Sequence, residues 1–346
     1  MMRNKILITG GAGYIGSHTC IELIEAGYDI VVYDNLSNSS LEALRRVEHI
    51  VGRSIEFIEG DILDSTLLHQ AFKANDFFGV IHFAGLKAVG ESVAKPLLYY
   101  KNNVTGTLNL LEVMQQHKVK NFVFSSSATV YGDPETLPIV ETAKRSCTNP
   151  YGQSKLTVEY ILEDLAKSDP SWNIISLRYF NPVGAHKSGQ IGEDPNDIPN
   201  NLMPYISQVA VGKLKQLSIF GNDYDTNDGT GVRDFIHVVD LAKGHASALA
   251  YLSNNESIGF LPINLGSGKG TSVLELVAAF IESTDKEVPY QFVARRPGDI
   301  ASCYASADRA QKLLNWSAKL SIVDMCRDTW LWQSMNPNGY TVSSQS

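Results

Sequence analysis

Two short segments carry side chains suited to proton transfer. Ser127 ends a run of three serines, and a second segment, Tyr-Gly-Gln-Ser-Lys, runs from Tyr151 to Lys155. Residues four apart share one face of a helix, so Tyr151 and Lys155 can point into the same cleft. A free tyrosine titrates near ~10, and a neighbouring ammonium favours its phenolate. The spacing therefore predicts a tyrosine base next to Lys155, with the Ser127 hydroxyl able to bind the oxygen that loses its proton.

A tyrosine and a lysine four apart also arise by chance on solvated helices, so the surrounding elements decide between the two interpretations. Near the N-terminus, an apolar, β-branched run at residues 5–9 indicates a buried parallel strand. It leads into Gly-Gly-Ala-Gly-Tyr-Ile-Gly at residues 10–16, and a helical pattern follows over 17–26. Such glycines permit a tight turn and let the backbone approach a pyrophosphate, which a helix N-terminus attracts. This order of elements predicts a dinucleotide site.

The end of the next strand indicates which dinucleotide is bound. The apolar run Ile-Val-Val-Tyr at residues 30–33 ends in Asp34, 18 residues after Gly16. A carboxylate at this place accepts hydrogen bonds from the free 2′-hydroxyl of the adenosine ribose and repels a 2′-phosphate. Asp34 therefore favours NAD over NADP.

Composition narrows the class of protein. The chain has 346 residues, 44% of them hydrophobic, and a net charge of −8 without a basic tract, which argues against nucleic acid or a membrane surface as partner. The four cysteines and eight histidines show no metal-ligand spacing, so neither a disulfide framework nor a metal site is expected. No signal peptide or membrane-spanning run is recognisable. A cytoplasmic protein is expected.

Strand-like and helix-like stretches alternate through the first half of the chain. Predicted strands lie at residues 5–9, 30–33, 55–58, 80–83, 122–124 and 174–177, and predicted helices at 17–26, 41–51, 65–72, 91–116 and 151–167. The alternation predicts an α/β fold built on a Rossmann-type, doubly wound parallel sheet, with ligands beyond the carboxyl ends of the strands. Asp34, Asp61, residues 83–87 and Ser127 all fall at such ends, which suggests one common site.

After residue 180 the regular alternation of strand-like and helix-like stretches ends. Loops rich in Gly, Asn, Asp and Pro at residues 184–201 and 221–231 separate shorter elements, and long structured loops usually serve binding. We predict an NAD-binding domain over residues 1–180 and a smaller, mixed α/β substrate domain over 181–340, with strands able to cross between them.

Taken together, these segments resemble the extended short-chain dehydrogenase/reductase family, and in particular its members that epimerise nucleotide sugars. The resemblance extends over nearly the whole chain. It is carried by residues 9–18, 34–36, 82–92, 124–132, 178–185, 199–204 and 231–234.

The resemblance implies roles for individual residues. Tyr151 is the expected base, Lys155 lowers its pKa and holds the nicotinamide ribose, and Ser127 assists proton transfer. The implied NAD contacts are Gly10, Gly13, Tyr14, Ile15, Gly16, Asp34, Asn35, Leu36, Ser37, Asn38, Ser39, Asp61, Ile62, Phe83, Ala84, Gly85, Leu86, Lys87, Asn102, Ser127, Tyr151, Lys155 and Phe180. The implied UDP-hexose contacts are Lys87, Ser127, Tyr151, Asn181, Asn201, Leu202, Phe220, Arg233, Arg296, Asp299 and Cys303.

Several of these side chains also have an ordinary structural interpretation. Arg233 can fork onto diphosphate oxygens or pair with the neighbouring Asp234. Asn201 precedes a helix whose amides suit an anion, or it is a simple N-cap. Phe220 could belong to the core. These alternatives stay open at the level of sequence.

The activity implied by the resemblance is interconversion of UDP-galactose and UDP-glucose. The phenolate of Tyr151 takes the proton of the 4-hydroxyl while hydride leaves carbon 4 for NAD, and the 4-keto sugar turns and is reduced on its opposite face. NAD is expected to stay bound, and a homodimer is expected. The small Cys303 implies room for the acetamido group of UDP-GalNAc and UDP-GlcNAc, although it could equally be a small buried hydrophobe.

Three rival functions differ in recognisable ways. Nucleotide-sugar 4,6-dehydratases carry an Asp-Glu pair directly after the Ser/Thr position, whereas Ala128 and Thr129 follow Ser127 here. Non-catalytic NAD(H) sensors on this fold typically lack the Tyr-Lys pair. An ordinary alcohol dehydrogenase would release NADH into solution. The residues favour the epimerase.

Overall fold

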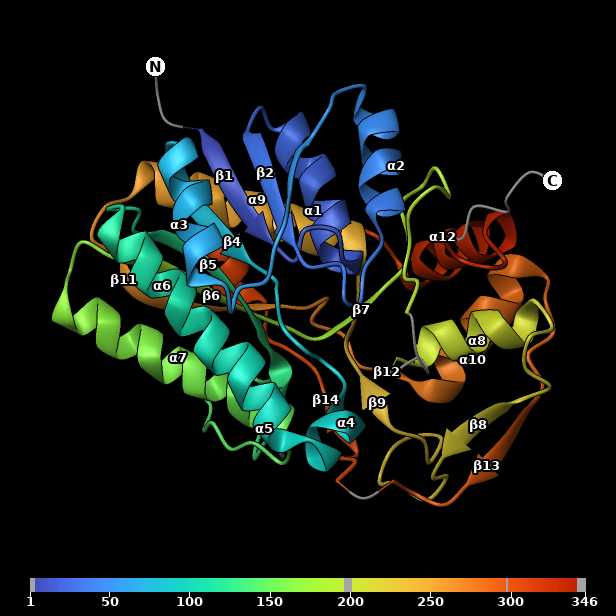
Figure 1. Ribbon diagram of the computed structural model, residues 1–346. Helices are drawn as coiled ribbons and strands as arrows, with labels where there is room; N and C mark the ends of the chain where they lie inside the picture. Colours follow the sequence, from blue (N-terminus) through green and yellow to red (C-terminus); the bar gives the residue numbers. More distant parts are fainter. Residues whose placement is uncertain (1–3, 196–200, 297, 341–346) are drawn as a thin grey trace.

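A parallel sheet forms the centre of the molecule (Figure 1). The computed structural model describes residues 4–195, 201–296 and 298–340. Among these residues, seven strands form one sheet in the order β11-β6-β5-β4-β1-β2-β3, and every pairing in it is parallel. The strands are β1 Lys5–Thr9, β2 Asp29–Asp34, β3 Glu56–Glu59, β4 Phe77–His82, β5 Asn121–Ser127, β6 Asn173–Tyr179 and β11 Gly259–Leu265.

The strand order contains a switch point between β1 and β4. From β1 the chain proceeds to β2 and β3 on one side, and then returns to place β4, β5 and β6 on the other. Thr9, the last residue of β1, lies opposite both Tyr33 on β2 and His82 on β4. A crevice at the carboxyl ends of the strands beside such a point is where doubly wound folds bind ligands.

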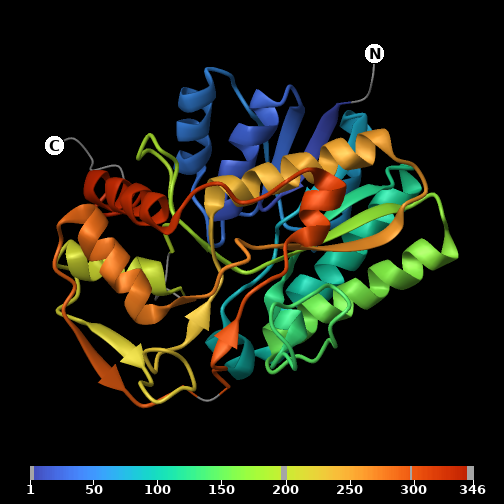
Figure 2. The ribbon, with the colours of Figure 1, turned by 180° about the vertical axis from the view of Figure 1, so that it is seen from behind.

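Helices cover both faces of the sheet, as Figures 1 and 2 show from opposite sides. One face is covered by α3 (Ser65–Ala74), α6 (Gly106–Gln116) and α7 (Pro150–Ser168), and the other by α1 (Tyr14–Glu25), α2 (Leu41–Val51) and α9 (Val238–Asn254). Each face has its own buried apolar cluster. The α/β, doubly wound fold predicted from the alternation is confirmed.

The predicted helix over residues 91–116 is wrong as one continuous α-helix. The structure has α4 (Val89–Ala94), α5 (Pro96–Tyr99), a π-helical segment over Tyr100–Thr105, and then α6. Pro96 lacks a backbone N–H and cannot continue the hydrogen-bond ladder of α4, so a new helix begins there. The wide turn of the π-helix then turns Asn103 toward the sheet edge, where its side chain bonds to the loop after β4.

The second half of the chain forms a smaller body beside the sheet. Helices α8 (Leu202–Ala210), α10 (Val273–Thr284) and α12 (Ile322–Met335) share a buried cluster with strand β8 (Leu217–Phe220), and the exposed strand β13 (Tyr290–Val293) pairs with β8 in parallel. Short pairings join β7 (Asn181–Val183) to β10 (Phe235–His237), and β9 (Val232–Arg233) to β12 (Thr271–Ser272) and β14 (Ser302–Cys303). Helix α11 spans Asp308–Leu314.

Three elements from beyond residue 180 pack with the larger body. Strand β11 pairs with β6 along its whole length, α9 packs on α1, and α11 packs on α9 and β11. In the described residues, no helix is both long and apolar enough to cross a membrane. Nor does any group of three or more His, Cys, Asp or Glu in these ranges lie in a position to hold a metal ion.

Candidate active site

The loop between β1 and α1 is shaped for a group that approaches the backbone closely. Gly10 has a φ of +72°, and a Cβ there would lie 2.6 Å from the backbone nitrogen of Ala84. A Cβ on Gly16 would lie 2.4 Å from the carbonyl oxygen of Gly10. Helix α1 begins after Gly13 without a side-chain cap, so its first N–H groups remain available to an anion. The loop therefore fits a pyrophosphate.

Asp34 lies at the end of β2 and faces this loop. Its carboxylate accepts hydrogen bonds from the backbone nitrogens of Ala12 at 3.0 Å and Leu36 at 2.9 Å, and from the Ser39 hydroxyl at 2.9 Å. A carboxylate offers about four lone-pair positions, so Asp34 can accept a further bond from a ribose hydroxyl. The bond to Leu36 also helps to hold that residue at a φ of +56°. Ser37 and Asn38 form the tip of the same turn.

Asp61 follows β3 and supports the turn after β2. Its Oδ2 accepts a hydrogen bond from the Asn35 amide at 2.9 Å, and its Oδ1 accepts one from the backbone nitrogen of Leu63 at 2.8 Å. Ile62 is buried, and a Cβ on Gly106 would lie 2.5 Å from its Cδ1. The predicted clustering of Asp34 and Asp61 at one edge of the sheet is thus found.

The loop after β4 is held by a residue that sequence reasoning missed. Asn103 donates to the carbonyl oxygen of Leu86 and to the Ser154 hydroxyl, both at 3.0 Å, and accepts from the Leu86 backbone nitrogen at 2.8 Å. It therefore joins this loop to helix α7. Asn102, the predicted cofactor contact, donates to the Asn103 side chain at 3.0 Å. The sequence alone does not indicate which of the two adjacent asparagines points inward.

Tyr151 and Lys155 lie on the first turns of α7, beside the end of β5. Asn149 caps this helix by accepting from the backbone nitrogen of Gly152 at 2.9 Å, and Pro150 occupies the first helical position. The Tyr151 phenol is hydrogen-bonded to Ser127, which also accepts a bond from the Thr129 hydroxyl at 3.0 Å. The predicted hydroxyl and phenol therefore contact each other, and the predicted ammonium lies one turn further along the same helix, where it binds the carbonyl oxygen of Ser125.

The electrostatics of this group differ from the prediction. The Lys155 ammonium donates to the carbonyl oxygen of Ser125 at 2.8 Å, and burial lowers the pKa of Lys155 to about 8. Burial also raises the pKa of Tyr151, and the hydrogen bond from Ser127 only partly opposes this. The pKa of Tyr151 is set by burial and the Ser127 bond, while the Lys155 ammonium is directed at the carbonyl oxygen of Ser125. The protein's own groups therefore leave the phenol protonated at neutral pH.

In the smaller body, Arg233 forms no ion pair with the adjacent Asp234 among the described contacts. Its Nη1 donates instead to the carbonyl oxygen of Val232 at 2.8 Å. The Asp234 carboxylate instead accepts from the backbone nitrogens of Ser267 and Ala305 at 2.7 and 3.1 Å. The local ion pair that the sequence left open is absent among the described contacts, and most of the Arg233 fork remains available to an anion.

Arg296 and Phe220 form a second, exposed group. The Arg296 guanidinium lies 4.7 Å from the centroid of the Phe220 ring, and its Nε donates to Asp299 at 2.9 Å. Phe220 is 39% exposed, so its interpretation as a core residue is wrong. A flat ring and a stacked guanidinium are suited to an aromatic base and its phosphate.

A carboxylate missed in the sequence, Glu193, links the two bodies. It accepts hydrogen bonds from Lys87 at 3.3 Å and from Asn201 at 3.0 Å. Asn201 occupies the N-cap position of α8 but makes no capping bond, and Leu202 is the first helical residue. Asn201 is therefore not a simple N-cap.

The two halves of the site meet at a small apolar cluster. Phe180, just after β6, is buried in it with Val130, and Cys303 and Ala128 pack against it. Cys303 also lies opposite Arg233 in the register of β14 and β9. Asn181 begins β7, directly after Phe180, and its backbone nitrogen donates to the carbonyl of Asp234. The cluster thus places Ala128, which follows Ser127, near Cys303, which stands opposite Arg233.

A glycine loop at a switch point, an acid after β2, and a tyrosine and a lysine four apart on the helix beside β5 define a dinucleotide-binding protein of the short-chain dehydrogenase/reductase class. The family model described as GDP-mannose 4,6 dehydratase matches residues 7–329. A UDP-glucose 4-epimerase from Dictyostelium discoideum is 63% identical over 340 residues, which cover 98% of each chain. The chain therefore belongs to the extended short-chain dehydrogenase/reductase family and, within it, to the UDP-glucose 4-epimerases.

Solved structures agree with this assignment. A UDP-glucose 4-epimerase from Bifidobacterium longum in complex with NAD+ and UDP is 54% identical, with a TM-score of 0.93 over 97% of this chain and 99% of that one. A UDP-Glc/GlcNAc 4-epimerase from Campylobacter jejuni is 37% identical, with a TM-score of 0.83 over 96% of this chain and 99% of that one.

Proposed function

We propose that this protein interconverts UDP-galactose and UDP-glucose by NAD-dependent oxidation at carbon 4, rotation of the 4-keto sugar and reduction of its opposite face. The observation that carries the proposal is the 63% identity to a named UDP-glucose 4-epimerase over 98% of the chain. The grouping of Ser127, Tyr151 and Lys155 at the carboxyl edge of the sheet supports it.

NAD fits the cofactor half of the site. The N–H groups at the start of α1 would hold the pyrophosphate, Asp34 the adenosine ribose and Lys155 the nicotinamide ribose. Phe83 and Phe180 would flank the cofactor, and Asp61 and Ile62 would border the adenine end. NAD supplies the hydride acceptor and, when oxidised, a positive charge that favours the phenolate form of a nearby tyrosine.

Tyr151 is the proton-transfer group in this proposal. Its phenolate takes the proton of the 4-hydroxyl as hydride leaves carbon 4, and returns that proton when the ketone is reduced. Ser127 holds the hydroxyl in reach of the phenol, since its own oxygen is already oriented by Thr129. Burial raises the pKa of Tyr151. A nearby positive charge must therefore favour the phenolate by more than burial disfavours it.

The nucleotide supplies the binding energy and the hexose is left free to turn. Arg233, and Arg296 stacked on Phe220, would bind the diphosphate and the base, and Asn181, Asn201, Leu202 and Asp299 would complete the UDP site. Lys87 would contact both the cofactor and the sugar. Placing affinity on the UDP keeps the ketone bound while its two faces exchange. Residues 1–180 would thus serve mainly the cofactor, and 181–340 mainly the UDP-sugar.

Cys303 would extend the substrate range to UDP-GalNAc and UDP-GlcNAc. It is a small residue that packs against the buried cluster containing Phe180 and stands opposite Arg233 in the strand register, so a larger side chain there would crowd the proposed sugar site. Burial raises the pKa of its thiol to about 11, which keeps it a neutral, inert group.

A 4,6-dehydratase is the rival activity, because the matching family model carries that description. Elimination of water needs an extra acid and base beside the sugar. The two residues after Ser127 are Ala128 and Thr129, and the Thr129 hydroxyl is already bonded to Ser127. The site therefore supports the epimerase and not the dehydratase.

The enzyme is proposed to act as a homodimer in the cytoplasm. Exposed apolar side chains on the adjoining helices α4 to α7, which include Val93, Leu97, Leu98, Leu108 and Tyr160, form a face suited to a second copy. Four cysteines without a disulfide fit a reducing compartment. Sedimentation of the pure protein at the mass of two chains is the expected result.

The proposed activity is tested with purified protein and UDP-galactose, without added NAD. UDP-glucose should form and reach a constant ratio to UDP-galactose, and NADH should not accumulate in solution. Absence of UDP-glucose with NAD bound, or formation of a 4-keto-6-deoxy sugar, would reject the proposal.

A further inference from the structure

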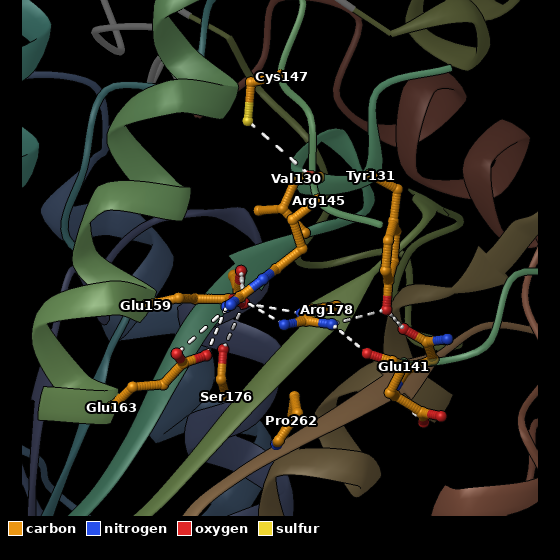
Figure 3. A network of polar contacts seen from close by, with 12 residues as sticks. Val130, Tyr131, Glu141, Arg145, Cys147, Glu159, Glu163, Ser176, Arg178 and Pro262 are labelled. Atoms are coloured by element: carbon orange, nitrogen blue, oxygen red, sulfur yellow. Dashed lines mark hydrogen bonds and ion pairs between the residues drawn. The ribbon is translucent and has the colours of Figure 1, made fainter. Parts of the chain in front are cut away.

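Behind the proposed proton-transfer group lies a buried ion pair to which the proposed reaction gives no role (Figure 3). Glu159 stands one helical turn beyond Lys155 on the same face of α7, and Arg178 lies on β6; Glu159 is 0% and Arg178 1% exposed. Arg178 Nε donates to Oε1 at 2.9 Å and Nη2 to Oε2 at 2.6 Å. Two parallel bonds fix the orientation of both groups as well as their distance.

Glu159 also attaches α7 to the strand that carries Ser127. Its Oε1 accepts from the Ser126 hydroxyl on β5 at 2.7 Å and from the Ser176 hydroxyl on β6 at 2.8 Å. One turn earlier on the helix, Lys155 donates to the carbonyl of Ser125. The helix face that presents Tyr151 is therefore fastened to β5 at the two residues directly before Ser127.

Arg178 reaches the residues that follow Ser127. Its Nη1 donates to the Tyr131 phenol and to the carbonyl oxygen of Glu141, both at 3.0 Å. Tyr131 ends the 3₁₀ turn Ala128–Tyr131 that begins directly after Ser127, and its phenol donates to Asn264 at 2.6 Å. The same ion pair thus holds the chain on both sides of Ser127.

The pair remains charged in spite of its burial. Burial acts to raise the pKa of Glu159, but the hydrogen bonds and charge of Arg178, with the bonds from Ser126 and Ser176, lower it below the usual value. Desolvating two charges is costly, and well-packed apolar residues often stabilise a core equally well. What apolar side chains could not supply is the set of directed bonds to β5, β6 and the turn after Ser127.

We propose that the Glu159–Arg178 pair is a positioning element that fixes Ser127, Tyr151 and Lys155 relative to one another without touching substrate or cofactor. This inference rests on the proposed function, since it assigns the pair to that reaction. Among the described contacts of the pair, none involves Phe220, Arg233 or Arg296, the proposed UDP contacts. The pair therefore affects the chemical step and leaves nucleotide binding alone.

The test compares Glu159→Gln with Glu163→Gln in the NAD-bound enzyme. Glu163 lies one turn further along α7 and binds Arg145, which also contacts Glu159 at 3.5 Å, so the control removes a charge from the same helix. Misplacement of reacting groups by about 1 Å can cost ~100-fold, so Glu159→Gln should lower kcat per bound NAD by about 10- to 100-fold. KM for UDP-galactose should stay within about threefold, and Glu163→Gln should match wild type in both constants. Wild-type kcat, or a raised KM with unchanged kcat, in Glu159→Gln overturns the proposal.

Hydrogen exchange of the NAD-bound enzyme tests the same idea without any assay of turnover. Backbone amides of residues 125–131 and 150–158 should exchange faster in Glu159→Gln and not in Glu163→Gln; unchanged exchange overturns the positioning role. If the wild-type enzyme does not epimerise UDP-galactose, the proposed function is rejected, but the hydrogen-exchange comparison still tests the positioning role.

If Glu159→Gln does not fold, Ser176→Ala removes one bond and keeps the ion pair. It should then lower kcat by about 3- to 10-fold at unchanged KM, and wild-type kcat would contradict the proposal.

Discussion

Lys155 and Ser125 are joined by a hydrogen bond of 2.8 Å from the ammonium to the backbone carbonyl, which fastens α7 to β5 next to Ser127. The ammonium also lies 5.0 Å from the centroid of the Phe124 ring. Lys155 thus ties α7 to β5, and under the proposed function it would also hold the nicotinamide ribose. Burial lowers the pKa of Lys155 to about 8.

Replacing this lysine should separate catalysis from folding. Lys155→Met keeps most of the apolar stem but removes the bond to Ser125 that positions α7 beside Ser127 and the proposed contact with the nicotinamide ribose, so turnover should fall by about 100-fold or more. Initial rates with UDP-galactose, normalised to bound NAD, measure this. Lys167→Met is the matched control, because Lys167 lies on the exposed side of the same helix and binds only Asp164 at 3.3 Å among the described contacts. Lys155→Met turnover within threefold of wild type would contradict the assignment.

Tyr151→Phe should abolish most of the activity and leave the cofactor bound. The variant removes only the oxygen that exchanges the proton, so we expect a loss of about 1000-fold in turnover with unchanged NAD content. Tyr160→Phe, nine residues further along α7 with a 43% exposed side chain, should be near wild type. NAD released on denaturation and the initial rate are the two measurements. Near-normal turnover in Tyr151→Phe would end the role of Tyr151 as base.

His82 should make the fold sensitive to acid. Thr9 and Thr107 contact its two ring nitrogens at 2.6 and 2.9 Å, and burial, with a smaller effect of the Lys155 charge, lowers the pKa of His82 to about 3. Between pH 6.5 and about 3 the unfolded chain binds a proton that the folded chain does not, so this histidine lowers stability as pH falls. Between pH 6.5 and 5, this histidine lowers the free energy of unfolding by about 2 kcal/mol.

Urea unfolding at pH 7 and pH 5 measures this effect. The free energy of unfolding should fall less between these pH values in His82→Gln than in wild type, whatever the variant's stability at pH 7. Equal pH dependence of the two proteins would show that His82 is protonated in the folded state or does not contribute.

Cys303→Tyr should narrow the substrate range. A tyrosine at this position, opposite Arg233 and against the cluster that contains Phe180, would take up room that the acetamido group of a hexosamine would need. Turnover of UDP-GalNAc should fall at least about tenfold, while UDP-galactose should be converted within about threefold of the wild-type rate. Equal loss of both activities would reject Cys303 as the residue that sets the range.

Much of the framework could be predicted because it depends on local patterns. The β-branched runs before Gly10 and Asp34 became β1 and β2, and the serine triplet ended β5, as expected for buried parallel strands. Once alternation indicated a parallel sheet, the shared edge of Asp34, Asp61 and Ser127 followed from geometry. The glycine loop could be predicted because few other arrangements require so many residues without a Cβ.

Other features depended on partners far apart in sequence. The periodicity of α7 marks Glu159 as an inward position, but only the neighbouring order of β5 and β6 brings Ser126, Ser176 and Arg178 to it. The direction of the Tyr151 pKa depends on burial, which spacing does not reveal. The break in the long helix could have been predicted from Pro96, whereas the π-helical turn that selects Asn103 over Asn102 could not.

The most direct test of the central claim follows the hydrogen on carbon 4. Pure protein is incubated with UDP-galactose that carries deuterium at carbon 4, and the UDP-glucose formed is analysed by NMR and mass spectrometry. Oxidation and reduction within one bound complex predict that deuterium stays at carbon 4 of the product, even in the presence of excess unlabelled NAD. Loss of deuterium to solvent, or its appearance at another carbon, would contradict the account.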